Sequence, residues 1–449
     1  MTDYAHYDVL VIGGGIHGAG VAQAAAAAGY SVLVLEQGEV ASGTSSRSSK
    51  LIHGGLRYLE HGQYSLVREC LRERSLLLKL APDLVQLRPF FIPVYADSSR
   101  NRFVIRIGLM LYSLLGGLGV DTRFRRVPRR EWSSLGGLKM ENLRAVFQYW
   151  DAQTDDVQLT RAVMASARKL GVKLLTRTEF CAAKSVVNAR AGDSHTLDSQ
   201  SADSQIIDSK SNERWEVRYR RADQNTEHRC TASAIVNAAG PWVNAVLARL
   251  QPPVVPLDVT LVQGTHLVLE AELSHGIYYL ESPRDKRPIF VMPWQISQQP
   301  DAANTQPEIR SAILLGTTET AFSGDPATVR PLPEEQEYLL ETYRHYFMRA
   351  GSSDNIKPLA AFAGLRVLPG DADSASIAHA SRPRDTVLQP DRMDRPRLVS
   401  VYGGKLTTYR STAQKVLNML VKGLPDCSPV ADTACLPLER VMDGESKIP

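Results

Sequence analysis

The strongest constraint on the fold is a glycine-rich turn between two apolar segments near the start of the chain. Residues 8–12 (DVLVI) are uniformly apolar apart from Asp8, as expected for a strand buried on both faces of a parallel sheet. The sequence GGGIHG follows at 13–18. Next comes an alanine-rich stretch with high helix propensity at 19–28, and after it a second apolar run that ends at Glu36. This order predicts a βαβ unit at the start of an α/β domain.

The spacing of the glycines indicates a dinucleotide site. Gly13 permits the tight turn, Gly15 lets the backbone approach a pyrophosphate, and Gly18 allows the helix to pack closely on the strand. The N-terminus of the helix attracts the phosphate charge. Glu36 can accept hydrogen bonds from ribose hydroxyls, and an acid at this point argues against the 2′-phosphate of NADP. The alternative is an ordinary glycine turn in a parallel sheet.

Two later segments repeat the pattern of an apolar strand that runs into small residues. They are 233–243 (SAIVNAAGPWV) and 398–410 (LVSVYGGKLTTYR), and in the second a helix is expected to begin near Lys405. Small residues let the backbone approach a flat ligand, and a helix N-terminus suits the flavin edge that becomes negative on reduction. No second GxGxxG follows a strand, and HExxH, GxSxG and P-loop patterns are absent from the sequence. Together these features favour FAD, although either segment alone is better explained as an ordinary strand–turn–helix junction, and no metal site is expected.

Several motifs, taken in order, resemble those of the FAD-dependent glycerol-3-phosphate dehydrogenases, within the D-amino-acid-oxidase-like flavoproteins. They are TSSRSSKLIHGGLRYLEHGQ (44–63), GPWV (240–243), DKRPIFVMPW (285–294), GTTET (316–320) and GGKLTTYR (403–410). The resemblance implies FAD held covalently or non-covalently, hydride transfer to flavin N5, and reoxidation by a quinone or oxygen. The implied reaction is the oxidation of sn-glycerol 3-phosphate to dihydroxyacetone phosphate.

The resemblance also implies which residues hold the cofactor and the substrate. The expected cofactor residues are Gly13, Gly15, Gly18, Glu36, Ser45, Ser46, Lys50, Ala239, Gly240, Gly403, Gly404, Lys405, Leu406 and Thr407. A small dianion needs fixed cations and donors. The expected substrate residues are Arg57, Tyr58, Arg366, Lys405 and Arg384, with Arg382 as the rival of Arg384.

The reaction needs a base for the hydroxyl proton, because the hydrogen on carbon leaves as hydride. His53 is the first candidate and His266 the second. Arg366 is expected to polarise the developing carbonyl oxygen, with Lys405 beside it. Two other functions stay open: a flavin oxidase or dehydrogenase of another small hydroxy acid or amine, which would use Arg366 for a carboxylate, and a flavin-binding protein without turnover. The retained His53, Arg57 and Lys405 count against the last.

The sequence departs from the family pattern at three places. Val367 stands where proline is expected after Arg366, and Glu319 stands where the family usually has aspartate. The chain also ends at Pro449, so most of the family's C-terminal helical domain is expected to be missing. The first two positions lie near expected substrate contacts and leave a related substrate open.

The chain is expected to be α/β, with a Rossmann-like FAD-binding domain interleaved with an antiparallel-sheet substrate domain. The expected FAD-binding segments are 1–75, 150–245 and 360–422, the substrate segments are 76–149 and 246–359, and 423–449 is a short tail. Strands are predicted at 261–269, 288–293 and 311–317, and a helix at 332–350. Asp-Ser recurs every five residues from Asp193, so 190–212 is expected to be a flexible loop without a catalytic role.

An arginine-rich region surrounds the longest uncharged apolar run. Residues 100–130 hold eight arginines, no lysine and one acid, and the run itself is 107–120, shorter than the roughly 20 residues of a spanning helix. Such a region suits an anionic membrane surface, which fits electron delivery to quinone, and it equally suits a core-facing helix beside a solvated basic loop. A net charge of +4 does not by itself indicate nucleic-acid binding.

Two features of the whole chain bear on its location. The five cysteines are scattered without a CxxC pair, which is typical of free thiols in a reducing compartment. The first eight residues hold no lysine or arginine, so a secretory signal is not expected. The expected location is the cytoplasm, with peripheral attachment to the inner membrane face as the accompanying possibility.

Overall fold

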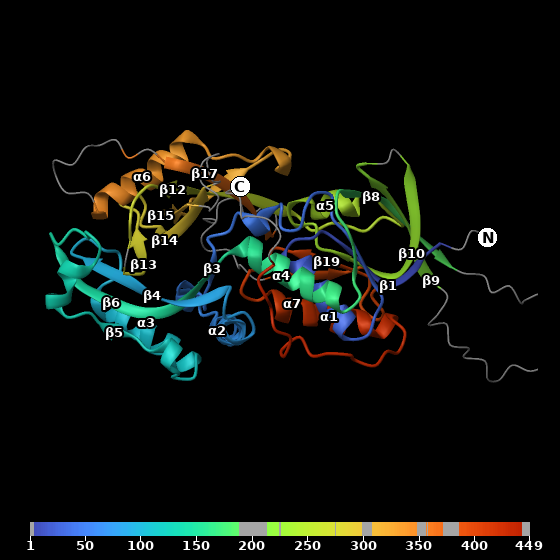
Figure 1. Ribbon diagram of the computed structural model, residues 1–449, viewed down its shortest axis with the longest axis horizontal. Helices are drawn as coiled ribbons and strands as arrows, with labels where there is room; N and C mark the ends of the chain where they lie inside the picture. Colours follow the sequence, from blue (N-terminus) through green and yellow to red (C-terminus); the bar gives the residue numbers. More distant parts are fainter. Residues whose placement is uncertain are drawn as a thin grey trace, which may run out of the picture.

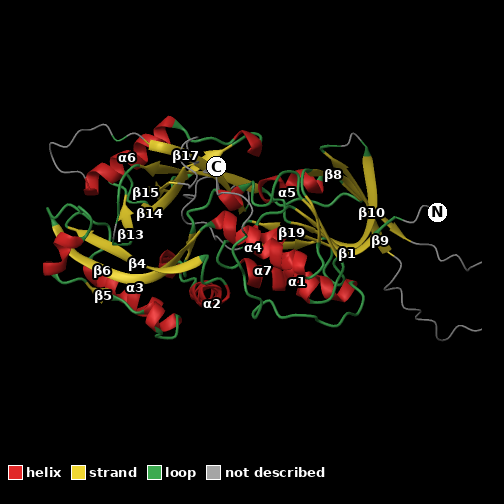
Figure 2. Cartoon of the chain, in the orientation of Figure 1, coloured by secondary structure: helices red, strands yellow, loops and turns green. Residues whose placement is uncertain are grey.

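The computed structural model describes residues 4–187, 213–223, 226–273, 275–298, 308–347, 356, 358–370 and 386–441. The predicted loop 190–212, Arg382 and Arg384 lie outside the described residues. Within these ranges the chain forms two mixed sheets, one in each half of an elongated molecule (Figure 1). Helices cover the outside of both halves, as the colouring by secondary structure in Figure 2 makes plain.

The first sheet has a parallel centre in the order β7–β2–β1–β10–β19. An antiparallel arm of β9 and β8 continues from β10, and β18 runs antiparallel to β19. Its strands are β1 (His6–Ile12), β2 (Val32–Leu35), β7 (Lys173–Leu175), β8 (Thr178–Val187), β9 (Glu213–Arg221), β10 (Glu227–Asn237), β11 (Leu250–Gln251), β18 (Val387–Pro390) and β19 (Leu398–Tyr402). This sheet confirms the Rossmann-like α/β prediction.

The apolar run of β1 is explained by burial on both faces. Val9 and Val11 enter one hydrophobic core, while Leu10 and Ile12 enter the core on the opposite face of the sheet. Consecutive side chains of a strand point to opposite faces, so a strand covered on both sides must be apolar at every position. Burial of this kind fixes the carboxyl end of β1, where the glycine turn begins.

Three helices cover one face of the first sheet. They are α1 (Ile16–Ala27), α4 (Asp156–Lys169) and α7 (Tyr409–Leu420). Helix α1 begins three residues before the predicted alanine-rich stretch, because residues 16–18 join its first turn. Its small side chains let the neighbours approach closely: a Cβ on Gly20 would lie 2.7 Å from the Tyr409 ring. The alanine-rich composition therefore reflects close helix packing as well as helix propensity.

The second sheet is antiparallel except where β13 runs parallel to β4. Its strands are β3 (Leu51–Ile52), β4 (Val85–Tyr95), β5 (Arg125–Arg126), β6 (Leu143–Thr154), β12 (Val259–Leu269), β13 (Ile277–Glu281), β14 (Pro288–Gln298), β15 (Glu308–Gly316), β16 (Thr320–Phe322) and β17 (Pro358–Pro369). Strand β17 pairs along its length with β12, so the substrate sheet extends past the boundary predicted at residue 360. The remaining helices are α2 (Tyr64–Leu80), α3 (Arg102–Leu115), α5 (Val243–Leu247) and α6 (Pro333–Phe347).

Helix α3 lies on the outer edge of the second half, beside β5 and β6 (Figure 1). Its inner face is buried through Leu109 and Tyr112. Its outer face is apolar and exposed, with Phe103 at 61%, Ile107 at 65% and Leu114 at 62%. The alternative of a helix that faces only the core is therefore wrong for α3, because one of its apolar faces is exposed. Among the helices of the described chain, none is both long enough and apolar enough to cross a bilayer.

Candidate active site

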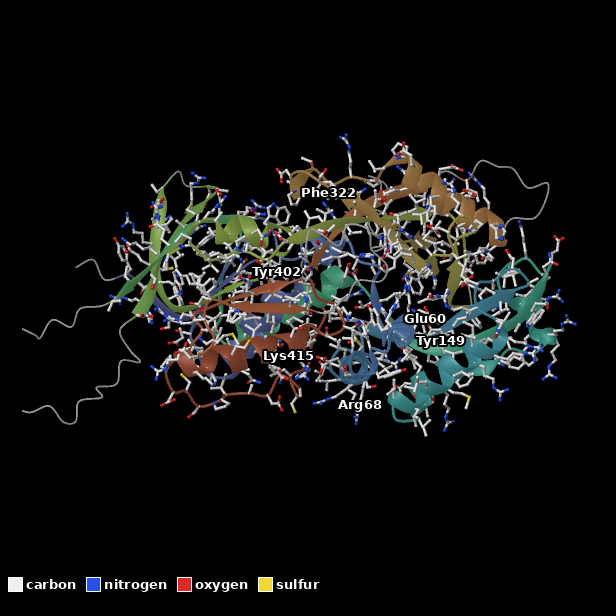
Figure 3. All side chains as sticks on the ribbon, turned by 180° about the vertical axis from the view of Figure 1, so that it is seen from behind. Glu60, Arg68, Tyr149, Phe322, Tyr402 and Lys415 are labelled. Atoms are coloured by element: carbon white, nitrogen blue, oxygen red, sulfur yellow. The ribbon has the colours of Figure 1, made fainter. Side chains whose placement is uncertain are left out.

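A cavity of about 500 Å³ is walled by segments of both sheets. From the first half come the turn after β1, the end of β10 and the loop after β19; from the second come residues of β12, β14 and β17. Tyr149 of β6 is a lining residue, and Tyr402 ends β19 directly before the lining Gly403; Figure 3 labels both tyrosines. The cavity is therefore assembled from parts of the chain that are distant in sequence.

One backbone contact joins two of these distant parts. The backbone N–H of His53 donates to the Thr407 hydroxyl at 3.2 Å. Both residues line the cavity, so this bond fixes the segment that carries His53 against the loop that carries Lys405. Two of the sequence motifs thereby meet at one place.

The glycine turn is shaped for a ligand backbone at the cavity wall. A Cβ on Gly13 would lie 2.5 Å from the Ala238 carbonyl oxygen, and Gly13 has φ +108°, so only glycine fits. Gly15 and Ile16 line the cavity at the start of α1, and the Ile16 N–H donates to the Ser45 hydroxyl at 2.9 Å. Helix α1 has no acidic residue in its first turn, so no side chain of the helix itself offsets its positive end. These residues fit the pyrophosphate of FAD.

Glu36 is held at the same end of the cavity. Its carboxylate accepts from the N–H groups of Gly14 at 2.5 Å and Gly38 at 2.7 Å. Burial raises its pKa, and these two hydrogen bonds oppose that shift. Glu36 directly follows β2, and an acid at this point of a dinucleotide-binding fold can accept hydrogen bonds from the ribose hydroxyls. Glu36 lines the cavity, as the residues for an adenosine moiety must.

Most of the residues predicted for the site line this cavity. They are Gly13, Gly15, Glu36, Ser45, His53, Arg57, Tyr58, Ala239, Gly240, His266, Arg366, Gly403, Gly404, Lys405, Leu406 and Thr407. The structure thus brings together residues from seven separate stretches of the described chain.

Three predicted cofactor residues do not line it. Gly18 packs against the Gly13 carbonyl, which is the role in helix packing that its spacing predicts. The Ser46 hydroxyl donates to the Gly43 carbonyl at 3.0 Å. The Lys50 ammonium is buried in an ion pair with Asp156 at 2.5 Å, so it is already neutralised behind the wall. The side chains of Ser46 and Lys50 are thus engaged with the protein itself, and this arrangement does not support their direct contact with a cofactor.

The loop after β19 differs from its prediction. Helix α7 begins at Tyr409, four residues after the predicted start at Lys405. The chain turns at Gly403 (φ +69°) and Gly404 (φ +110°), and the next residues complete the turn before the helix. Lys405 and Thr407 therefore reach the cavity from a loop and not from a helix N-terminus.

Two cations and a tyrosine gather beside His53. The Lys405 ammonium lies over the Tyr58 ring, 4.4 Å from its centroid, an attractive cation–π contact. Arg57 is half-buried, and within the described residues no carboxylate lies at ion-pair distance from its guanidinium. Its positive charge is thus available to an anion in the cavity.

Arg366 is engaged in a different way. Its guanidinium pairs with the Glu319 carboxylate at 2.7 Å, and Arg287 approaches the same carboxylate at 3.8 Å. Arg287 also donates to the Glu319 carbonyl oxygen at 2.9 Å. All three residues line the cavity. One carboxylate therefore offsets part of the charge of two arginines, and it fixes the direction in which they point.

His266 lies deep in the second sheet, where its ring stacks on Phe362 at 5.0 Å between centroids. Its Nε2 is 3.0 Å from the Ser49 hydroxyl. Burial, aided by the charges of Arg366 and Lys50, lowers the pKa of His266 to about 3. The imidazole is therefore neutral at physiological pH, and its protonated form is disfavoured.

Arg287 and His17 belong to the cavity wall but were not predicted as site residues. Arg287 lies inside the motif DKRPIFVMPW, so the motif itself was the available signal. His17 occupies a variable position of the glycine turn and packs against Gly404, and burial lowers its pKa to about 4. No spacing rule for a glycine turn singles out that position.

Known proteins resemble this chain over most of its length. Residues 8–405 match the family described as FAD dependent oxidoreductase. The chain is 34% identical over 436 residues to the glycerol-3-phosphate dehydrogenase of Pseudomonas aeruginosa, covering 96% of this chain and 75% of that protein. It is 33% identical over 425 residues to the D-erythritol 1-phosphate dehydrogenase of Brucella abortus, covering 94% and 74%.

A solved structure is similar across the same length. The glycerol-3-phosphate dehydrogenase of Bacillus halodurans, complexed with FAD, superposes with a TM-score of 0.64 at 25% identity, covering 96% of this chain and 68% of that one. The family resemblance, the fold class and FAD as the cofactor are thus confirmed. This chain belongs to the FAD dependent oxidoreductase family and is an FAD-dependent enzyme.

Proposed function

We propose that the protein oxidises sn-glycerol 3-phosphate to dihydroxyacetone phosphate and passes the electrons to a quinone or oxygen. FAD, when bound, supplies the acceptor for the hydride that leaves carbon 2 of the substrate. The observation that carries the proposal is the half-buried Arg57, which lines the same cavity as the glycine turn and has no carboxylate partner within the described residues.

In this proposal Arg57 receives the substrate phosphate. A dianion requires uncompensated positive charge, and Arg57 offers a planar fork of donors. Lys405 lies close by, over the Tyr58 ring, and adds a second cation on that side. Arg366, which pairs with Glu319, is proposed to face the oxygen on carbon 2, where negative charge develops as the carbonyl forms.

His53 is proposed to take the hydroxyl proton. Its backbone is fixed by Thr407, and it lines the cavity on the side of Arg57. The second candidate, His266, is a poor base at neutral pH because its pKa is about 3. We assign His266 the role of a neutral hydrogen-bonding group in the wall. Arg384, predicted as a further substrate contact, lies outside the described residues.

A longer polyol phosphate is the second candidate substrate. The similarity to the D-erythritol 1-phosphate dehydrogenase is nearly equal to that to the glycerol-3-phosphate enzyme. The same phosphate site would serve both. An amino or hydroxy acid is less well supported, because the Arg366 guanidinium that would receive its carboxylate is paired with Glu319.

The test is anaerobic reduction of the purified holoenzyme. Glycerol 3-phosphate, erythritol 1-phosphate, glycerol, glycine and lactate are each added to the oxygen-free protein, and the flavin absorbance near 450 nm is followed. We expect rapid bleaching by a polyol phosphate and much slower bleaching by glycerol at the same concentration. Bleaching by glycine or lactate alone would transfer the assignment to an acid oxidase, and bleaching by none would favour a flavoprotein without turnover.

We also propose that helix α3 attaches the protein to the cytoplasmic surface of the inner membrane. The exposed apolar residues Phe103, Ile107, Met110 and Leu114 share one face of the helix. Exposed arginines lie on the helix itself and in the segment that follows it in the sequence: Arg102, Arg106, Arg123, Arg126, Arg129 and Arg130. An apolar face beside positive charge is complementary to an anionic leaflet, and attachment there would bring the flavin close to membrane quinone.

A further inference from the structure

A buried carboxylate outside the cavity organises the wall that carries Arg366. Glu335 is 5% exposed and is the third residue of α6. Its Oε2 accepts from Gln263 Nε2 at 2.6 Å and from the Thr265 hydroxyl at 2.6 Å. Its Oε1 accepts from the hydroxyls of Thr318 at 2.8 Å and Thr320 at 2.7 Å. Four side chains from two parts of the chain thus meet on one carboxylate of a third part.

Successive side chains of the segment GTTET at 316–320 point alternately to the cavity and to the Glu335 carboxylate. Thr317 and Glu319 line the cavity, whereas Thr318 and Thr320 donate to Glu335. Alternate residues of an extended chain point in opposite directions, so holding the two threonines determines where Glu319 projects. The Thr318 hydroxyl also accepts from the Thr265 N–H at 2.9 Å, which ties the segment to β12.

The chain of contacts continues to the arginines. Glu319 lies between the two threonines that Glu335 holds, and its carboxylate pairs with Arg366 at 2.7 Å. Its carbonyl oxygen accepts from Arg287 at 2.9 Å. A displacement of residues 318–320 would therefore move the partner of both guanidinium groups.

We propose that Glu335 is a positioning residue for substrate binding: it fixes Thr318 and Thr320 so that Glu319 orients Arg366 and Arg287 toward the substrate. The inference rests on the proposed function in taking this wall as the substrate side. The competing explanation is a purely structural helix cap, since the Leu332 N–H donates to Glu335 at 3.2 Å and an acid at this position caps a helix.

Matched variants of the holoenzyme separate these explanations. Glu335→Gln removes the carboxylate charge, and Thr318→Val removes one of the hydroxyl donors. Two variants serve as controls: Thr318→Ser keeps the hydroxyl, and Glu334→Gln changes an exposed acid in the same helical turn. For each variant the FAD content, Tm, the KM and kcat for glycerol 3-phosphate, and the Kd of sulfate from its effect on the flavin spectrum are measured.

A positioning role predicts that Glu335→Gln and Thr318→Val raise KM about tenfold and weaken sulfate binding about fivefold, with FAD content unchanged. Thr318→Ser and Glu334→Gln stay near the parent values. The decisive measurement compares the double variant with Glu319→Gln. If Glu335 acts through Glu319, the Glu319→Gln/Glu335→Gln protein has the same sulfate Kd as Glu319→Gln alone.

Two results would overturn the proposal. The first is a lower Tm of Glu335→Gln with unchanged KM and sulfate Kd, which would make Glu335 a helix cap only. The second is additive effects of Glu335→Gln and Glu319→Gln on the sulfate Kd, which would rule out action through Glu319. If Glu335→Gln does not fold, Thr318→Val decides by the same measurements. Failure of the proposed function is recognised separately, because glycerol 3-phosphate would then not reduce the unsubstituted protein, while sulfate binding still reports on the wall.

Discussion

The Glu319 carboxylate pairs with the Arg366 guanidinium at 2.7 Å in the wall of the cavity between the two sheets. The pair lowers the net positive charge on this wall. Arg57 also lines the cavity, and no carboxylate of the described residues lies at ion-pair distance from its guanidinium.

Removing that countercharge tests the balance between charge and orientation. Glu319→Gln should weaken sulfate binding about fivefold, as Glu335→Gln does, because the two arginines lose the carboxylate that orients them and this loss outweighs the removed negative charge. It should also lower kcat, because the Arg366 guanidinium is no longer held in one direction. Titration of the flavin spectrum with sulfate and steady-state kinetics give the two values. Tighter sulfate binding in this variant would show that charge outweighs orientation and would contradict the positioning argument.

The phosphate assignment predicts a selective effect at Arg57. Arg57→Ala should raise KM for glycerol 3-phosphate on the order of 100-fold and change KM for glycerol by less than about threefold. Arg68→Ala is the matched control, because Arg68 is an exposed arginine on α2, labelled in Figure 3. Equal effects on both substrates would remove Arg57 from the phosphate site.

The glycine turn predicts the outcome of adding one methyl group. Gly13→Ala should give a colourless protein, because the new Cβ would lie 2.5 Å from the Ala238 carbonyl oxygen at a φ that favours glycine. Gly108→Ala is the control, since no atom lies within 4 Å of a Cβ at that helical position. The ratio of flavin to protein absorbance measures retention of FAD. A normal ratio in Gly13→Ala would argue against a pyrophosphate at this turn.

Burial of His266 predicts acid sensitivity of the fold. The pKa is about 3 in the folded protein against an ordinary value of 6.5, so between these pH values the unfolded chain binds a proton that the folded chain does not. Stability should therefore fall as pH decreases through this window, by up to about 1.4 kcal/mol per pH unit from this group.

Denaturant unfolding at pH 7, 6 and 5 checks the sign. His266→Asn should show a smaller loss of stability on acidification than the parent chain, whereas the exposed His61→Asn should lose as much as the parent. An identical loss in His266→Asn would mean that the imidazole is protonated in the folded state.

The outer face of α3 predicts binding to anionic vesicles. Ile107→Asp combined with Leu114→Asp should abolish co-sedimentation with vesicles that contain phosphatidylglycerol, because both side chains are more than half exposed on the proposed contact face. Val255→Asp is a control at an exposed apolar side chain of the other half. Added salt should weaken the binding of the parent chain. Unchanged sedimentation of the double variant would exclude α3 as the contact.

The sequence predicted those parts of the site in which a few consecutive residues determine the backbone. The turn at Gly13 is one, since a strand, a turn and a helix adjoin along the chain and glycine alone tolerates the geometry. The Gly403–Gly404 turn is another, although its helix begins later than expected. The family resemblance supplied Arg57, Arg366 and Lys405, which no local pattern distinguishes from surface charges.

The pairings within the site required the tertiary structure. Glu319 meets Arg366 because β16 and β17 flank β12 in the same sheet, a register that composition does not reveal. Lys50 meets Asp156 from the start of α4, so a lysine expected at the cofactor lies in a buried ion pair. The exposure of α3 likewise depends on which of its faces packs against the sheet.

The bond between the His53 backbone and the Thr407 hydroxyl has a consequence for biosynthesis. The two residues are 354 positions apart, so a ribosome must translate past residue 407 before this wall exists. Until then β1 and its glycine turn have no partner loop from β19, and the cavity lacks the wall formed by residues 403–407. Firm capture of the prosthetic group is thereby expected only after that loop has been synthesised.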